Sequence, residues 1–221
     1  DPLDDDPDGI VLTAPGELAR VLDKVVTDAA PVSLEAGSRG LEMARALVAR
    51  WRESGADPAH VAGDLHLDPL AALSRTGRLP QSPADAFAEI AGFVGEVDGA
   101  FPEVRTLGID LRPVHEAGAG PSLELAAGLA QAAEALRLAE RGGLAPDVAA
   151  RQLTWLVPVD DDVFMGIAKL RALRRCWATM AQAVGSQAAP RLKAETSRRM
   201  LAGRDAYVNL LRNTLAAFAG A

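Results

Sequence analysis

The stretch Gln-Leu-Thr-Trp-Leu-Val at residues 152–157 is short and almost wholly apolar, and Asp160, Asp161 and Asp162 follow it closely. After these aspartates, apolar residues recur every three or four positions: Phe164, Ile167, Leu170, Leu173, Trp177 and Met180. A short apolar run is typical of a buried strand, and the later spacing is typical of one face of a helix. Carboxylates suit the positive end of a helix dipole. This stretch therefore predicts a strand followed by a long helix.

The same order recurs along the chain. Strands are predicted at residues 32–35, 59–65, 104–109 and 191–195, and 10–12 is a possible sixth. Helix starts are predicted at Asp68-Pro69, Ser82-Pro83, Pro121 and Asp205, and helix stops at Gly55 and at Gly142-Gly143. Alternating strands and helices favour an α/β fold with a parallel sheet. The first choice is a TIM-barrel-type βα fold, incomplete and lacking its last strands. An open doubly wound sheet is the second.

Composition excludes several classes of protein. The chain has 221 residues, with 23 lysines and arginines against 30 acidic residues, for a net charge of −7. Such an acidic chain is not expected to bind nucleic acid or an anionic membrane surface. A single cysteine, Cys176, excludes an internal disulfide framework and a multi-cysteine metal site. No apolar run is long enough to span a bilayer, so we expect a cytoplasmic protein.

The first eight residues include five aspartates. We interpret residues 1–8 as an acidic lead-in and residues 9–221 as one barrel region.

The histidines and the glycine-rich turn do not form a recognisable cofactor or metal motif. Gly118-Ala119-Gly120 lacks the third glycine of a dinucleotide-binding loop and is expected to form a tight turn. His60, His66 and His115 are not spaced as metal ligands, and no metal site is predicted. Asp64-Leu65-His66 resembles the start of a cobalamin-ligating motif, but Pro69 replaces its glycine, so a loop histidine is expected at position 66.

Charged residues on the long predicted helix are interpreted as a surface. Lys169, Arg171, Arg174 and Arg175 are expected on a solvated or partner-facing side, with a site for acidic groups as the alternative. Cys176 is expected to be a packing residue.

Ionisable side chains at the strand ends are the candidate site, because barrel active sites form where the strands end. Arg112 and His115 follow the strand at 104–109, and Lys193 and Glu195 lie in the last strand on one face. The alternatives are a structural ion pair and a substrate contact. Arg112, His115, Lys193 and Glu195 are thus candidate substrate-binding residues at a barrel mouth.

Three spaced motifs resemble one known family, the methylmalonyl-CoA mutases. The first is His115-Glu116-Ala117-Gly118-Ala119 with Leu123-Glu124-Leu125-Ala126, and the second runs from Phe164 to Ala172, with Trp177 after it. The third is Thr196-Ser197 followed by the segment from Asp205 to Thr214, and Asp68-Pro69-Leu70 and Arg75-Thr76-Gly77 also fit. The resemblance implies a TIM-type barrel and adenosylcobalamin chemistry that interconverts methylmalonyl-CoA and succinyl-CoA, a step of propionate metabolism.

Departures from the family pattern imply a chain that is not catalytic. Arg112 and Pro113 stand where catalytic chains have a Tyr-His pair, and Lys193 and Glu195 stand where they have His-x-Gln. Arg198 replaces a glycine, and we expect no cobalamin-binding domain in this chain. The pattern resembles the small subunit of the heterodimeric enzyme, which implies no catalytic residue and no cofactor in this chain. Adenosylcobalamin would be bound by a large partner subunit.

Two alternatives stay open. One is a divergent acyl-CoA mutase barrel that still binds an acyl-CoA at its mouth. The other is an unrelated βα-barrel enzyme acting on a phosphorylated ligand, although no phosphate-binding loop supports it.

Overall fold

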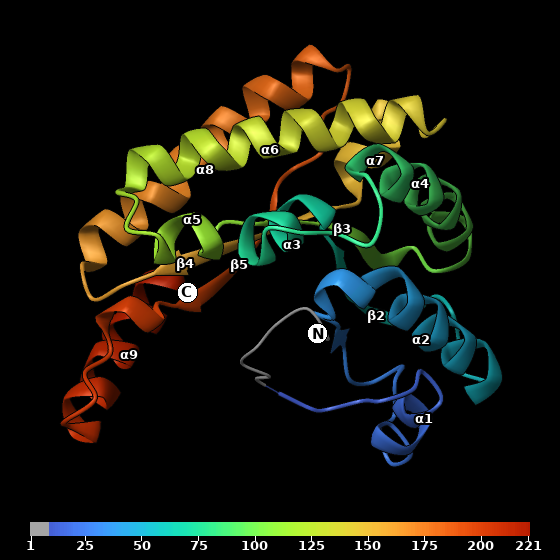
Figure 1. Cartoon of the computed structure of the whole chain (residues 1–221), viewed down its shortest axis with the longest axis horizontal. Coiled ribbons are helices and arrows are strands. Elements are labelled where there is room, and N and C mark those ends of the chain that lie inside the picture. Colours follow the sequence, from blue (N-terminus) through green and yellow to red (C-terminus); the bar gives the residue numbers. More distant parts are fainter. Residues whose placement is uncertain (1–8) are drawn as a thin grey trace.

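A sheet of five parallel strands forms the centre of the computed structural model, which describes residues 9–221. The strands lie side by side in chain order: β1 (Val32–Ser33), β2 (Ala62–Leu67), β3 (Glu103–Asp110), β4 (Leu153–Val159) and β5 (Arg191–Thr196). A doubly wound sheet would reverse its strand order part-way across, and this sheet does not. The sheet curls into part of a barrel, so the predicted incomplete α/β barrel is confirmed (Figure 1).

Helices follow the strands and pack around the outside of the curl. The longer ones are α2 (Gly40–Ser54), α3 (Pro69–Thr76), α4 (Pro83–Ala100), α6 (Pro121–Arg141), α8 (Val163–Ala183) and α9 (Ala206–Gly220). The shorter ones are α1 (Glu17–Val21), α5 (Arg112–Glu116) and α7 (Pro146–Arg151), with the 3-10 turns η1 (Gly37–Arg39) and η2 (Arg198–Met200). Contacts run from α4 to α6, from α6 to α8 and from α8 to α9, and Figure 1 shows α6 and α8 side by side.

The predicted helix boundaries hold where a side chain or a glycine sets them. Asp68 caps α3 by accepting from the amide of Ala71, and Ser82 caps α4 by accepting from that of Asp85. Gly55 ends α2 in the left-handed conformation at φ 71°. These local signals therefore fix where the long helices begin and end.

Three strand predictions are corrected. The strand expected at 32–35 ends at Ser33. Residues 10–12 form no strand, and the strand expected at 59–65 starts later, at Ala62, and runs to Leu67. The turn formed by residues 58–60 occupies the start of the expected run. The predicted acidic lead-in, residues 1–8, lies outside the described residues.

The outer face of the sheet is sealed by aromatic packing. Trp155 of β4 meets Trp177 of α8 edge-on, with ring centroids 5.4 Å apart, and both side chains are fully buried. Trp51 of α2 and Phe101 pack similarly at 5.6 Å. The concave face instead carries polar side chains, and it is there that the candidate site forms.

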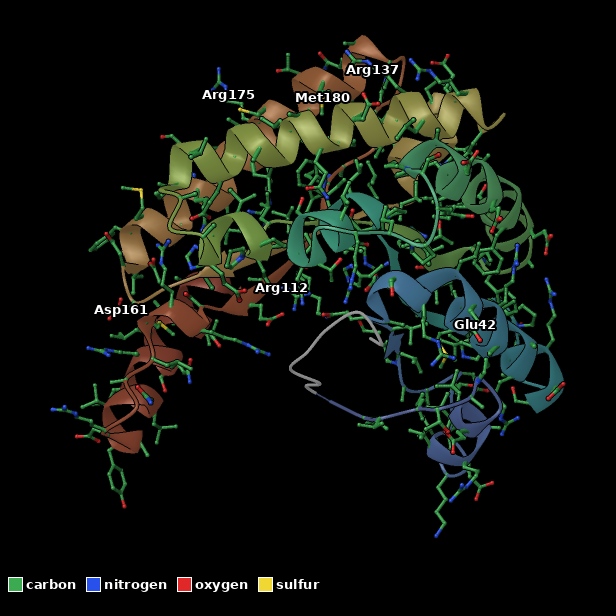
Figure 2. The ribbon with its side chains drawn as sticks, viewed as in Figure 1. Glu42, Arg112, Arg137, Asp161, Arg175 and Met180 are labelled. Atoms are coloured by element: carbon green, nitrogen blue, oxygen red, sulfur yellow. The ribbon has the colours of Figure 1, made fainter. Side chains whose placement is uncertain are left out.

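Two residues of helix α8 differ in burial from their predictions. Lys169 is buried rather than solvated, because its amine has carboxylate and carbonyl partners inside the fold. Cys176 is exposed rather than packed in the core. Arg171, Arg174 and Arg175 are exposed as expected, and Figure 2 shows Arg175 pointing away from the molecule. No helix within residues 9–221 is long and apolar enough to cross a bilayer.

Candidate functional site

Arg112 is the centre of an ion-pair cluster where the strands end. It is the first residue of α5, directly beyond β3, and it lies on the concave side of the sheet (Figure 2). Its guanidinium donates to Asp110 at 2.9 Å, to Glu195 at 2.9 Å and to Glu35 at 2.8 Å. A planar guanidinium has donors on several sides and can serve several carboxylates at once, which an ammonium does less well. Arg112 therefore joins the ends of β1, β3 and β5.

Lys193 extends this cluster from β5 to β1. Its Nζ donates to Glu35 Oε1 at 2.5 Å and to Ser33 Oγ at 3.1 Å. The first and last strands of the sheet are thus connected by side chains across the concave face. We call Glu35, Asp110, Arg112, Lys193 and Glu195 the mouth cluster.

The charges of the mouth cluster stabilise one another. Burial acts to raise the pKa of Glu35, but Arg112 and Lys193 outweigh it and lower that pKa to about 2. Burial acts to lower the pKa of Arg112, and Asp110 with the two glutamates raises it above its usual range. Glu35 and Arg112 therefore stay charged across the physiological range at the centre of this ionic layer.

The structure places three of the four predicted site residues in this layer. Arg112, Lys193 and Glu195 come together there, although Lys193 and Glu195 pair with other residues and not with each other. The sequence analysis did not identify Asp110 and Glu35 as site residues. The feature that could have identified them is their position at the end of β3 and just after β1.

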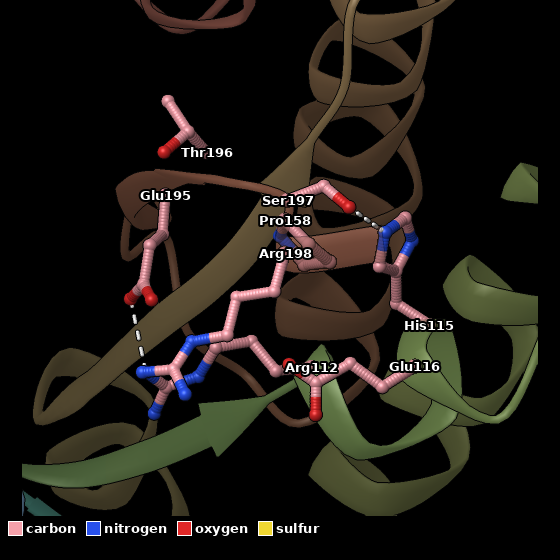
Figure 3. Close-up of a pocket in the computed structure, with 8 residues that line it drawn as sticks. All are labelled: Arg112, His115, Glu116, Pro158, Glu195, Thr196, Ser197 and Arg198. Carbon is pink, nitrogen blue, oxygen red and sulfur yellow. Dashed lines mark hydrogen bonds and ion pairs between the residues drawn. The ribbon is translucent and has the colours of Figure 1, made fainter. Parts of the chain in front are cut away.

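His115 belongs to a different, buried group. Its Nδ1 lies 2.8 Å from Glu124 Oε1 and its Nε2 lies 2.6 Å from Ser197 Oγ (Figure 3). Lys169 completes the group by donating to Glu124 at 2.7 Å and to the carbonyl of Pro158 at 2.5 Å. We call His115, Glu124, Lys169 and Ser197 the buried tetrad. It connects α5, α6 and α8 with the chain after β5.

The buried tetrad contains a Ser-His-Glu arrangement, which in some proteins forms a nucleophilic triad. Here Ser197 is only 2% exposed, and its Oγ also accepts from the amide of Arg199 as the cap of η2. Burial acts to raise the pKa of Glu124, but His115 and Lys169 together lower it. Lys169 thus balances the charge of Glu124. A nucleophile needs access for its substrate, and Ser197 has none. The arrangement therefore holds elements together.

His66 corrects the prediction of a loop histidine. It lies in β2 with a left-handed φ of 42°, at a bulge where β2 has one more residue than β3 between paired positions. Gly108 makes room for it, because a Cβ at that position would lie 3.1 Å from His66 Nδ1. The Nε2 atom is buried and has no hydrogen-bond partner. Burial lowers the pKa of His66, although Glu35 and Asp64 act to raise it.

The described histidines are not placed to ligate cobalamin. Ligation would need an imidazole nitrogen that is free and accessible. The Nε2 of His66 is buried and both nitrogens of His115 are bonded. His60 precedes β2, at the opposite end of the strands from the mouth cluster, and pairs with Asp57. Within residues 9–221 no group of three or more side chains is arranged to hold a metal ion.

Asp68 connects the ends of β2 and β3 beside the mouth cluster. Besides capping α3, it accepts from the amide of Asp110 at 2.8 Å and from Gln131 at 2.7 Å. Burial raises its pKa to about 7, against these hydrogen bonds, and the charge of Asp110 adds to the rise.

The fold and the mouth cluster define a class of protein: a partial α/β barrel whose strand ends are closed by ion pairs. The particular family follows from comparison with known sequences. A family model described as Methylmalonyl-CoA mutase matches residues 6–221, and the chain belongs to this family.

The similar proteins include small subunits and large subunits. The chain is 42% identical over 201 residues to the methylmalonyl-CoA mutase small subunit of Streptomyces virginiae, covering 90% of this chain and 32% of that protein. It is 32% identical to the small subunit of Propionibacterium freudenreichii subsp. shermanii, over 96% of this chain and 33% of that protein. It is 26% identical to the large subunit of Streptomyces virginiae, over 96% of this chain and 29% of that protein. The chain thus spans about a third of the length of these relatives.

Proposed function

We propose that this chain is the barrel region of a methylmalonyl-CoA mutase small subunit, and that it supports a catalytic large subunit without binding substrate itself. The complex would interconvert methylmalonyl-CoA and succinyl-CoA. Identity to proteins named small subunits exceeds identity to those named large subunits, which supports this assignment.

The mouth cluster is the observation that carries the proposal. A barrel that admits a long acyl-CoA needs an open interior at its strand ends. Here Arg112 and Lys193 draw Glu35, Asp110 and Glu195 together across that space. Opening it would separate Glu35 from Arg112 and Lys193, the two cations that lower its pKa to about 2. The acyl group of methylmalonyl-CoA carries a carboxylate, which would have to displace Glu35 or Glu195 from Arg112 or Lys193 to bind here.

The cofactor would belong to the partner. In the family, adenosylcobalamin supplies radical chemistry when bound. The histidines of residues 9–221 do not fit its ligation, as described above. We therefore place the cofactor in the large subunit of a heterodimer, along with the residues that select the acyl-CoA.

Calorimetric titration tests the proposal. The protein containing this chain is titrated with the large subunit, then separately with methylmalonyl-CoA and with adenosylcobalamin. Tight association with the large subunit and no saturable heat from either small molecule is the expected result. Saturable methylmalonyl-CoA binding in the absence of the large subunit would overturn it and favour a divergent acyl-CoA mutase barrel.

A further inference from the structure

A groove of about 610 Å³ lies outside the barrel interior, between α2, α3 and α4. Its floor is the end of β2 at Leu67, with Ala86 and Ile90 of α4, all of them buried. Its walls are formed mainly by small and aliphatic side chains: Pro15, Leu41, Ala46, Leu79 and Pro80. Binding sites for small organic molecules have this size and this apolar lining. The mouth cluster and the buried tetrad contribute nothing to it.

Asp68, whose pKa burial raises to about 7, also lines the groove beside Leu67. The other charged groups stand at the rim, and they are not equivalent. Just before α2, Arg39 is already paired with Glu42 at 2.8 Å, whereas Arg45 of α2 is exposed and makes no ion pair with any described residue. Glu89 of α4 also lines the groove, is exposed and has no ion-pair partner within residues 9–221. Glu89 and Arg45 do not reach each other across the groove. An anion would therefore be favoured at the α2 rim and disfavoured at the α4 rim.

We propose that this groove binds an amphipathic carboxylate, with its alkyl chain on Leu67, Leu79 and Ile90 and its carboxylate at Arg45. Apolar burial supplies most of the affinity, because Leu67, Leu79 and Ile90 offer aliphatic surface along the groove. The guanidinium sets the direction of the ligand, since it offers paired donors that match a carboxylate. The inference is independent of the proposed subunit role, because it uses none of the residues that carry that role.

Decanoate and decanol are the probes, and isothermal calorimetry on the protein containing this chain is the measurement. Both have the same alkyl chain and only decanoate is charged. We expect saturable binding of decanoate at one site. Arg45→Gln should weaken it about threefold to tenfold, the range for a partly exposed charged hydrogen bond. Decanol should bind Arg45→Gln and the unaltered protein equally.

Two further variants separate the groove from other surfaces. Glu89→Gln should strengthen decanoate binding, and Ala46→Phe should abolish the binding of both probes by filling the groove. Arg174→Gln on α8 is the matched control for loss of an exposed arginine and should change nothing. A denaturation curve for Ala46→Phe shows that the variant folds. Absence of decanoate binding at millimolar concentration, or binding that Ala46→Phe leaves intact, would overturn the proposal. Equal affinity in Arg45→Gln and Glu89→Gln would overturn the role of Arg45.

Discussion

Arg112 Nη1 donates to Glu195 Oε2 at 2.9 Å and so joins α5 to the end of β5, 83 residues further along the chain. The same guanidinium also holds Glu35 and Asp110. Removing Arg112 would leave Glu195 without its ion-pair partner, and would leave Glu35 with Lys193 alone and Asp110 with the half-exposed Arg75 alone.

We therefore predict that Arg112→Met lowers the free energy of unfolding by about 3 kcal/mol, the usual cost of removing one partner from a largely buried ion pair. Arg75 is the matched control. It makes a single bond to Asp110 from a side chain that is 44% exposed, so Arg75→Met should cost about 0.5 kcal/mol. Denaturant titration of both variants measures the two values. Equal losses would show that Arg112 is not the centre of the cluster.

The buried tetrad should behave as one unit. Lys169→Met leaves Glu124 buried and short of a cation, and we expect a loss of about 3 kcal/mol. Glu124→Gln in the same chain removes the unpaired charge, so the double variant should be more stable than the sum of the single losses predicts, by about 1 to 2 kcal/mol. A double-mutant cycle by denaturant unfolding measures this coupling. Strict additivity would contradict a shared network.

Ser197 should not react as a nucleophile. A fluorophosphonate probe needs an accessible hydroxyl, and Ser197 is almost completely buried. We expect no labelling of the folded protein, checked by mass spectrometry of the peptide that contains Ser197. Labelling that Ser197→Ala removes would show a working triad.

His66 gives a pH dependence of defined sign. Burial lowers its pKa in the folded state, so as the pH falls below about 6.5 the unfolded chain takes up a proton first and the folded state loses stability. His66→Asn removes this titration, and asparagine tolerates the left-handed φ at this position. The advantage of the unaltered protein over His66→Asn should therefore shrink between about pH 8 and pH 5.

Asp68 acts in the opposite direction over part of this range. Its folded pKa is raised to about 7, so its contribution to stability is lost as the pH rises towards that value. The contribution of Asp68 is the same in the unaltered protein and in His66→Asn, so it cancels when their stabilities are compared. Parallel stability curves would contradict the placement of His66.

Gly108 should be needed for the bulge beside His66. A Cβ there would lie 3.2 Å from the Cα of His66, and we expect Gly108→Ala to cost about 1 to 3 kcal/mol through overpacking. Gly95 of α4 has no atom within 4 Å of the equivalent Cβ, so Gly95→Ala should stabilise the helix by about 0.5 to 1 kcal/mol. Thermal unfolding of both variants distinguishes a steric effect from a general effect of replacing glycine.

The sequence predicted those parts of the fold whose signals are local. Asp68, Ser82 and Gly55 mark helix ends within three residues, and the apolar period of α8 is visible along one segment. Five-residue α5 is too short to show a period, so its start at Arg112 was not predicted. The sequential strand order follows from helices that each return the chain to the next position in the sheet.

The site was predicted only in part, because its contacts join distant segments. Arg112 and Glu195 were identified by their places at strand ends, but the partner of each depends on how far the sheet curls. The charge of Lys169 suggested a surface residue, and its burial is explained by Glu124, 45 residues earlier, together with the carbonyl of Pro158. The bulge that turns His66 into a strained strand residue has no local signal, since its cause is the glycine at position 108 in the next strand.

The most direct test of the central claim is the stoichiometry of substrate binding in the assembled complex. Equilibrium dialysis with labelled methylmalonyl-CoA, using the large subunit and the protein that contains this chain in equal amounts, counts the sites. One acyl-CoA bound per pair of subunits is the predicted result, because we propose that the ion pairs of the mouth cluster keep substrate out of this chain. Two acyl-CoA molecules per pair, with the second lost on mutation of Lys193 or Glu195, would contradict it.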